Sequence, residues 1–277
     1  MWSQTTKKLC GVVKLLHPRI IPCLLIQDGG LVKTVEFKNP KYLGDPINAV
    51  RIFNEKQIDE LIVLDIDATV KRKDPDFKMI SNLASECRMP LCYGGGINNS
   101  DQIRRIIELG VEKVSLSSAA IQNPDIIDEG AKYVGSQSIV ITLDIKNTNN
   151  GYMIFTENGR NNTGRDPVSL VKEYQMYGVG EIVINSILFD GTMNGYHFDL
   201  IDLIKDEIGV PLTVMGGAGS HNDIEILFSK YGLIGAGAGS LFVFKGPYKA
   251  VLINYPNEEE KEKILLNYYK TQANQQI

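Results

Sequence analysis

The chain has 277 residues, of which 43% are hydrophobic and 22% are charged, and this composition argues against disorder over most of its length. The 29 basic and 33 acidic residues give a formal net charge of −4, and no dense basic stripe is present. Both observations argue against nucleic acid as the main partner, whereas local loops of any protein can still bind small anions.

The first 18 residues precede the regular part of the chain and are interpreted as an N-terminal extension. No run reaches 18 consecutive apolar residues, and Lys14 interrupts the short apolar stretch at 11–16, so neither a membrane span nor a signal peptide is predicted. The four cysteines form no CxxC pair and no metal-type group with the three histidines. We therefore expect a reduced, cytoplasmic protein without a metal site or a cofactor.

Short apolar runs alternate with longer amphipathic stretches along the rest of the chain. Eight strands are predicted, at residues 20–26, 61–66, 90–93, 113–116, 138–143, 181–185, 211–215 and 233–235. Helical segments such as 99–109 and 166–177 separate them, and 257–270 is predicted as a charged terminal helix before a short tail. Eight alternating units predict a parallel sheet closed into a single (β/α)8 TIM barrel over residues 19–277.

The barrel is predicted to consist of two similar halves. Residues 61–65 (LIVLD) resemble 181–185 (EIVIN), and 90–97 (PLCYGGGI) resemble 211–218 (PLTVMGGA). The separations agree, because Glu60 and Glu181 are 121 residues apart and Gly95 and Gly217 are 122 apart. A constant separation of this kind indicates a two-fold internal repeat.

Glycine-rich loops follow the third and the seventh predicted strands, at 94–97 and 216–219. Glycine lets backbone N–H groups approach an anion closely, and small residues one unit later would complete each site. The alternative is that these glycines only form tight turns, but two loops in the same register favour two phosphate cradles. The predicted phosphate-binding residues are Gly95, Gly96, Ser117, Ser118, Gly216, Gly217, Gly239 and Ser240.

Asp144 ends the fifth predicted strand and is the candidate catalytic residue, because the carboxyl ends of barrel strands form the catalytic face. The equivalent position in the first half, 119 residues earlier, is Leu25. Acid–base chemistry on a sugar-like substrate favours two opposed carboxylates, and only one is present. Asp65 has either a capping or a functional role.

Other polar residues lie at predicted strand ends. Lys33, Asp190 and Gly191 are candidate substrate-binding residues, and Lys146 also ends a strand. His197 and His221 have no identifiable partner in the sequence and are interpreted as ordinary surface or loop histidines.

These motifs resemble the cyclase subunit of imidazole glycerol phosphate synthase, a barrel of histidine biosynthesis that receives ammonia from a glutaminase. The resemblance covers residues 19–244, through 19–24 (RIIPCL), 44–46 (GDP), 58–61 (IDEL), 94–97 (GGGI), 162–164 (NTG), 190–192 (DGT) and 216–219 (GGAG). It implies acid–base catalysis by two aspartates, of which Asp144 matches one and Leu25 replaces the other. It also matches Lys33 to the family's lysine after strand one.

The resemblance further implies an ammonia gate of charged residues at the other end of the barrel. The matching residues are Arg19, Glu60, Lys113 and Glu181. The alternative is that these four residues only stabilise the barrel as a ring of ion pairs. The chain resembles a divergent branch of the family that is associated with surface-polysaccharide genes. Two features carry this resemblance, the leucine in place of the strand-one aspartate and the segment 24–33 (LLIQDGGLVK). Members of that branch are thought to supply ammonia for sugar amidation.

The leading hypothesis is therefore an ammonia-handling barrel subunit that forms a heterodimer with a glutaminase and acts alongside a separate sugar amidotransferase. A phosphorylated small molecule would be its ligand. The alternatives are a true cyclase in which a neighbour such as Asp28 assists Asp144, a sugar-phosphate isomerase of the sister barrel family, and a non-catalytic scaffold that activates a glutaminase.

Overall fold

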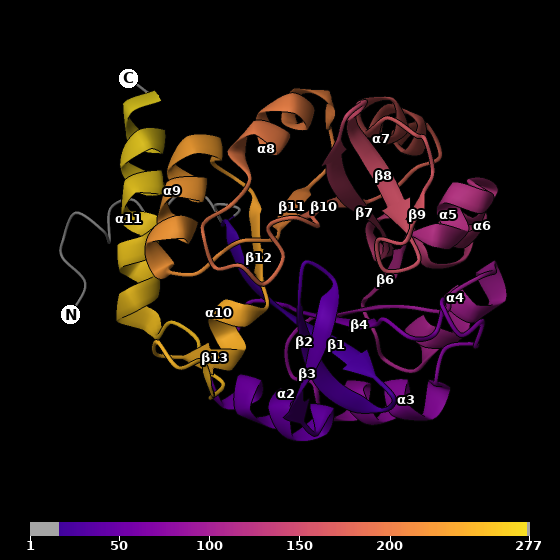
Figure 1. Ribbon diagram of the computed structural model, residues 1–277, viewed down its shortest axis with the longest axis horizontal. Helices are drawn as coiled ribbons and strands as arrows, with labels where there is room; N and C mark the ends of the chain where they lie inside the picture. The colour runs from indigo at the N-terminus through magenta and orange to yellow at the C-terminus, as the bar shows by residue number, and fades with distance from the viewer. Residues whose placement is uncertain (1–16, 276–277) are drawn as a thin grey trace.

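The computed structural model describes residues 17–275 and contains one closed parallel barrel surrounded by helices (Figure 1). Each barrel strand pairs in parallel with the next, and the pairing of the first strand with the last closes the barrel. This confirms the predicted (β/α)8 fold. The barrel strands are β1 (Arg19–Gln27), β4 (Leu61–Asp65), β5 (Leu91–Gly94), β6 (Lys113–Leu116), β7 (Ile139–Thr148), β10 (Glu181–Ser186), β11 (Leu212–Met215) and β12 (Gly235–Ala238).

Amphipathic helices cover the outside of the barrel. In α4 (Ser100–Glu108), for example, Ile103 and Ile106 are buried against the barrel, while the Asn99 side chain caps the first turn by accepting from the backbone N of Gln102 at 2.9 Å. The other helices of the ring are α2 (Pro46–Glu55), α3 (Phe77–Glu86), α6 (Asp125–Val134), α7 (Pro167–Met176), α8 (Phe198–Ile204), α9 (His221–Tyr231) and α11 (Glu258–Gln275). The terminal α11 packs beside α9 (Figure 1).

The last strand lies later in the chain than predicted. Residues 233–235 were expected to form it, but β12 is the Gly-Ala-Gly-Ala segment from 235 to 238, and Leu233 is 50% exposed. Glycine and alanine have low strand propensity, so the pattern of apolar residues pointed to the wrong segment. Close packing explains the glycine, because a Cβ on Gly235 would lie 2.0 Å from the Oγ1 of Thr213.

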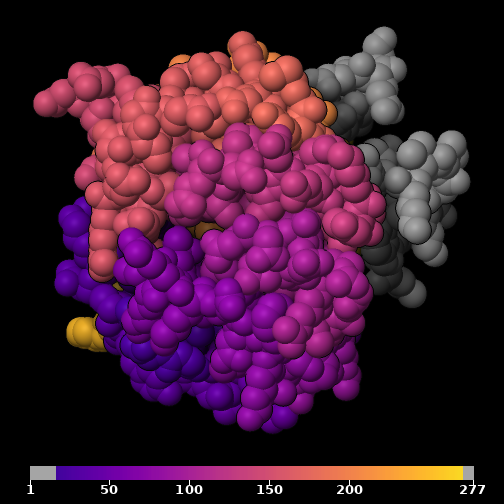
Figure 2. All heavy atoms as spheres, turned by 90° about the vertical axis from the view of Figure 1, so that its right-hand side faces the viewer, coloured from indigo at the N-terminus to yellow at the C-terminus, as the bar shows by residue number. Residues whose placement is uncertain are grey.

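Two antiparallel hairpins that were not predicted extend β1 and β7 beyond the barrel. The first contains β2 (Gly30–Val35) and β3 (Lys38–Gly44), and the second contains β8 (Gly151–Thr156) and the short β9 (Asn161–Asn162). The first residues of β2 and β8 are 121 residues apart, so the hairpins obey the internal repeat. In Figure 2 the indigo and pink segments that contain them project from the same side of the molecule.

The barrel interior holds a small apolar cluster that is separate from the main core between the strands and the helices. Cys23 and Cys92 belong to this cluster and are free thiols, and burial raises the pKa of Cys23 to about 12. The cluster consists of Ile21, Cys23, Ile62, Cys92, Val140, Val183 and Met215, with Leu25 and Leu64 packed against it. The barrel interior is therefore largely apolar between its two ends, apart from the buried hydroxyls of Ser115 and Thr142, which lie 2.6 Å apart.

Within residues 17–275, no helix is long and apolar enough to cross a membrane. The same part of the chain has no group of three or more histidine, cysteine or acidic residues arranged to hold a metal ion. Of the predicted N-terminal extension, residues 1–16 lie outside the described residues.

Candidate active site

One cavity lies at the carboxyl ends of the barrel strands, and every substrate-binding residue predicted from the sequence lines it. They come from loops that are far apart in the chain and meet only because the barrel closes. The predicted residues in the cavity wall are Lys33, Gly95, Gly96, Ser117, Ser118, Asp144, Asp190, Gly191, Gly216, Gly217, Gly239 and Ser240. The structure therefore brings the predicted site together in one place.

Each glycine loop contains two consecutive glycines with positive φ, Gly95 and Gly96 in the first loop and Gly216 and Gly217 in the second. Gly95 has a φ of 116° and Gly217 has a φ of 108°, both in the region that favours glycine. A Cβ on Gly95 would lie 2.3 Å from the carbonyl oxygen of Asp65, and a Cβ on Gly217 would lie 1.9 Å from that of Gly195. Only glycine fits at either position, but strand register and the signs of φ match Gly95 with Gly216 and not with Gly217, so the two loops correspond at a separation of 121 residues instead of the predicted 122.

Two buried polar atoms in the cavity wall have no hydrogen-bond partner among the described residues. They are the Oγ of Ser240 and the Oδ1 of Asn185. A buried polar atom without a partner costs free energy, and it is commonly satisfied by a ligand or by water. Both atoms are therefore available to accept or donate a hydrogen bond to a molecule in this cavity. Asn185 was not predicted as a site residue, although it lies in one of the two repeated strand motifs.

Asp144 lies in this cavity on β7. Burial raises its pKa to about 7, although the Asn185 Nδ2 opposes the rise by donating to Asp144 Oδ1 at 2.9 Å, and the negative charge of Asp190 adds to it. A carboxyl group with this pKa exchanges protons readily near neutral pH. Its position and its protonation therefore both suit a general acid or base.

Leu25 occupies the position in the first half that Asp144 occupies in the second. Leu25 pairs with Leu64 of β4, and Asp144 pairs with Asn185 of β10. Leu64 and Asn185 are themselves 121 residues apart, which is the repeat separation of these strands. Strand register thus gives the same equivalence as the sequence alignment, and Leu25 also lines the cavity.

Lys33 forms an ion pair inside the cavity. Its Nζ lies 2.7 Å from Asp190 Oδ1, and the hydroxyl of Thr34 donates to the other oxygen of Asp190 at 3.1 Å. Close packing holds the first hairpin against this loop, since a Cβ on Gly191 would lie 2.3 Å from the Thr34 carbonyl oxygen. Lys33 and Asp190 therefore connect the β2–β3 hairpin to the loop after β10.

Asp65 has a structural role in the turn after β4. Its Oδ1 accepts from the backbone N of Asp67 at 2.9 Å and of Ala68 at 3.1 Å. Burial nevertheless raises its pKa, and the residue lines the cavity. The capping role left open by the sequence is present, and it occurs in the cavity wall.

The interpretation of His197 as a histidine without partners was wrong. Its Nδ1 lies 2.9 Å from the Ser186 hydroxyl, its Nε2 lies 3.1 Å from the Tyr152 hydroxyl, and its ring stacks on Phe189 at 4.2 Å. It therefore anchors the loop between β10 and α8. Sequence spacing could not reveal this, because Tyr152 belongs to the unpredicted β7–β8 hairpin. His221 is the first residue of α9.

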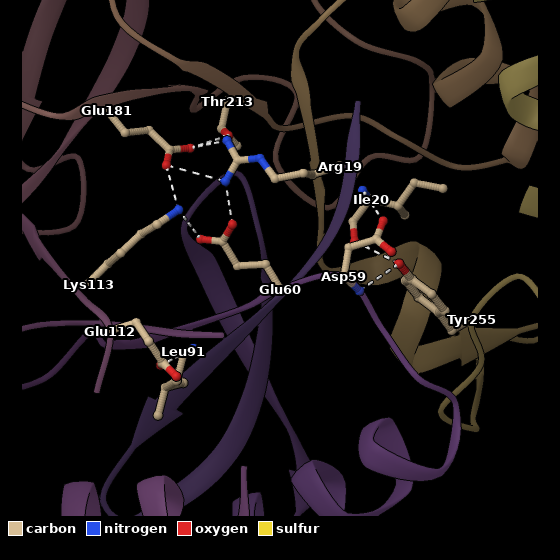
Figure 3. Close-up of polar contacts among 10 residues, drawn as sticks. All are labelled: Arg19, Ile20, Asp59, Glu60, Leu91, Glu112, Lys113, Glu181, Thr213 and Tyr255. Atoms are coloured by element: carbon tan, nitrogen blue, oxygen red, sulfur yellow. Dashed lines mark hydrogen bonds and ion pairs between the residues drawn. The ribbon is translucent and has the colours of Figure 1, made fainter. Parts of the chain in front are cut away.

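Four charged residues form a closed ring at the opposite end of the barrel (Figure 3). Arg19 contacts both Glu60 and Glu181, and its Nη2 lies 2.7 Å from Glu181 Oε1. The Nζ of Lys113 lies 2.8 Å from a carboxylate oxygen of each glutamate. The cations and anions alternate around the ring, so the structure assembles all four residues that the resemblance predicted.

The ring remains charged despite its burial. Burial opposes ionisation of Glu181, but the charges and hydrogen bonds of Arg19 and Lys113 outweigh it and lower the pKa of that carboxyl. Burial likewise opposes the charge of Lys113, and the two glutamates outweigh it and raise its pKa. A fifth residue, the fully buried Thr213, donates its hydroxyl to Glu181 at 2.7 Å and was not predicted.

A closed parallel eight-stranded barrel, with glycine loops and a carboxyl group in a cavity at the carboxyl ends of its strands, defines a barrel of the TIM type. The family described as histidine biosynthesis protein matches residues 19–248, and the chain belongs to this family. Within it, the chain is a relative of the HisF cyclase subunits of imidazole glycerol phosphate synthase.

Individual relatives agree with this assignment. A subunit from Natranaerobius thermophilus named imidazole glycerol phosphate synthase subunit HisF is 38% identical over 90% of this chain and 99% of its own length. A provisionally named HisF subunit from Leptospira interrogans is 53% identical over 90% of this chain and 98% of its own length. A provisionally named hisF3 subunit from Vibrio vulnificus is 55% identical over 92% and 98% of the two chains.

Proposed function

We propose that this protein is an ammonia-handling HisF-like subunit that acts in the cytoplasm with a HisH-like glutaminase and supplies ammonia for the amidation of a surface-polysaccharide sugar. The observation that carries the proposal is a combination of features. Glycine loops are present in both halves and the four charged residues form one closed ring, but the acid–base pair is reduced to Asp144 facing Leu25. Binding and entry features are thus retained where the chemistry of cyclisation is not.

The route between the two ends supports ammonia transfer. The charged ring lies at one end of the barrel, the apolar cluster lies in its interior, and Asp144 lies at the other end. An uncharged molecule as small as ammonia can pass among apolar side chains at far lower cost than an ion. The ring at the entrance would then control which molecules enter.

The names of the relatives also support a divergent branch. The relatives from Leptospira and Vibrio, at 53% and 55% identity, carry provisional HisF names, whereas the Natranaerobius relative with the unqualified name is 38% identical. The chain is therefore more similar to relatives whose cyclase activity the names leave open. This pattern fits loss of the strand-one aspartate.

Two experiments test the proposal. In the first, the gene is expressed in a histidine auxotroph that lacks its own cyclase, and we expect no growth without histidine. In the second, the gene is deleted from its own host, which is grown with glutamine labelled with ¹⁵N in the side-chain amide. We expect loss of the label from an amidated surface sugar, and rescue of the auxotroph at physiological expression would contradict the proposal.

A true cyclase is the second candidate, and the structure weakens the part of it that used Asp28. Asp28 pairs with Lys71, its side chain is 72% exposed, and it does not line the cavity. Asp28 is therefore poorly placed to replace the missing carboxylate. A sugar-phosphate isomerase of the sister barrel family is disfavoured, because that family has no glutaminase partner and would not need a charged gate. The scaffold hypothesis is tested by Asp144→Asn.

A further inference from the structure

A second cavity lies outside the first, between the two hairpins that project from the barrel mouth. Four residues, Thr34, Phe37, Ile66 and Asn158, line both cavities, so the two are continuous. The hairpins meet between them, since a Cβ on Gly159 of the second hairpin would lie 3.3 Å from the ring of Phe37 in the first. A ligand in the first cavity can therefore extend into the second.

Two cations in this outer cavity have no ion-pair partner among the described residues. They are Lys146, on β7, and Arg160, in the turn between β8 and β9. Lys146 is half-buried, and its ammonium lies 5.7 Å from the centre of the Phe155 ring. A third cation, Lys38, lies 3.8 Å from Glu36 in the same wall, and these two charges offset each other. The outer cavity consequently carries a net positive charge.

The position of Lys146 relates this charge to the candidate catalytic group. Lys146 follows Asp144 by two residues on β7, so both side chains point to the same face of the strand, about 6.6 Å apart along it. Asp144 faces the inner cavity and Lys146 faces the outer one. A molecule of the size of one sugar residue can reach both.

The chemistry of the two cavities differs. The inner cavity offers backbone N–H groups and hydroxyls in two glycine loops, which suit phosphate groups. The outer cavity instead offers an ammonium and a guanidinium, and the guanidinium fork matches the two oxygens of a carboxylate. With the phosphate positions already provided inside, the remaining positive charge fits a carboxylate.

We propose that the outer cavity binds the carboxylate of an acidic sugar whose phosphate lies in the inner cavity, with Lys146 and Arg160 as the recognition residues. The inference rests on the proposed function for the phosphate end of the ligand, and it narrows the substrate class to phosphorylated uronic acids. Binding there would hold the carboxylate beside Lys146, two residues along β7 from Asp144.

Calorimetric titration with two probes tests the inference. Glucose 1-phosphate and glucuronic acid 1-phosphate differ only in the carboxylate, and each is titrated into the wild-type protein at about 0.1 M salt. We expect the acid to bind about tenfold more tightly, because two charge-assisted hydrogen bonds are added. The advantage should fall to about twofold or less in Lys146→Gln combined with Arg160→Gln, whereas the affinity for glucose 1-phosphate should not change.

Lys249→Gln is the matched control, because Lys249 is an exposed lysine outside both cavities and its loss should leave the tenfold difference intact. Equal binding of the two probes by the wild-type protein, or an advantage that survives in the double variant, would overturn the inference while leaving the proposed function standing. If neither probe binds, the inference and the phosphate role of the glycine loops are both wrong, whereas ammonia supply is decided separately by the ¹⁵N experiment.

Discussion

The two halves of the barrel have the same backbone but different chemistry at the mouth. The glycine loops after β5 and β11 each contain two consecutive glycines with positive φ, and β2 and β8 begin at equivalent positions of the repeat. At the strand ends, by contrast, the first half has Leu25 and Gln27 where the second has Asp144 and Lys146. Backbone amides bind phosphate whatever the neighbouring side chains are, whereas proton transfer depends on one particular side chain. One half can therefore lose its reactive group without losing its binding loop.

The largest expected effect is on the half that retains its carboxylate. Asp144→Asn keeps the size and the contact with Asn185 but cannot transfer a proton, so we expect the amidated product to fall by about 10²–10⁴-fold. The measurement is the ¹⁵N content of the polysaccharide in cells that carry the variant. Unchanged incorporation would favour the scaffold hypothesis and exclude proton transfer by Asp144.

The reverse substitution in the first half restores the missing carboxylate. Leu25→Asp should produce an ammonia-dependent cyclase activity that the wild-type protein lacks, because two opposed carboxylates then face the cavity. Consumption of the cyclase substrate in the presence of ammonium salts measures this. Leu25→Asn is the control, since its side chain is polar and similar in size but carries no titratable proton. Equal activity of both variants would show that polarity alone, and not acid–base chemistry, is missing.

The charged ring allows a comparison between the two ends of the barrel. Lys113→Ala leaves Glu60 and Glu181 with Arg19 alone, so we expect a loss of about 2–3 kcal/mol in the free energy of unfolding and weaker stimulation of the glutaminase. Chemical denaturation and a glutaminase assay measure the two effects. Lys132→Ala, in an exposed pair with Asp128 on α6, should leave both the stability and the glutaminase stimulation close to those of the wild type. Full stimulation and intact ammonia transfer with the Lys113 variant would contradict a gating role.

The smallest expected effect is on the pH dependence of stability. Burial in the folded protein raises the pKa of Asp144 from 3.8 to about 7. The free energy of unfolding of the wild-type protein therefore decreases as pH rises from about 4 to 7 and this group ionises. Asp144→Asn removes this loss. The free energy of unfolding of the variant minus that of the wild type should be about 2 kcal/mol larger at pH 8 than at pH 4. This value is smaller than the full pKa shift implies, because solvent has access to the cavity. An equal difference at both pH values would show that Asp144 has an ordinary pKa.

The parts of the site that could be predicted share one property, which is that local sequence determines them. The glycine loops require particular backbone angles, and both were identified together with the small residues that follow them. The hairpins over the mouth were missed, although Asp28-Gly29 between two apolar runs is a turn signal that could have revealed the first. Asn185, Thr213 and the partners of His197 were missed because their contacts come from segments distant in the chain.

The sequence by itself determined the alternation of strands and helices, the internal repeat and the two glycine loops, because periodicity and glycine placement are local properties. Only the tertiary structure decided that twelve residues from separate loops line one cavity, that Arg19, Glu60, Lys113 and Glu181 form a closed ring, and that burial brings the pKa of Asp144 to about 7. Barrel closure is the physical reason. It brings distant strand ends within contact distance and excludes water from the groups between them.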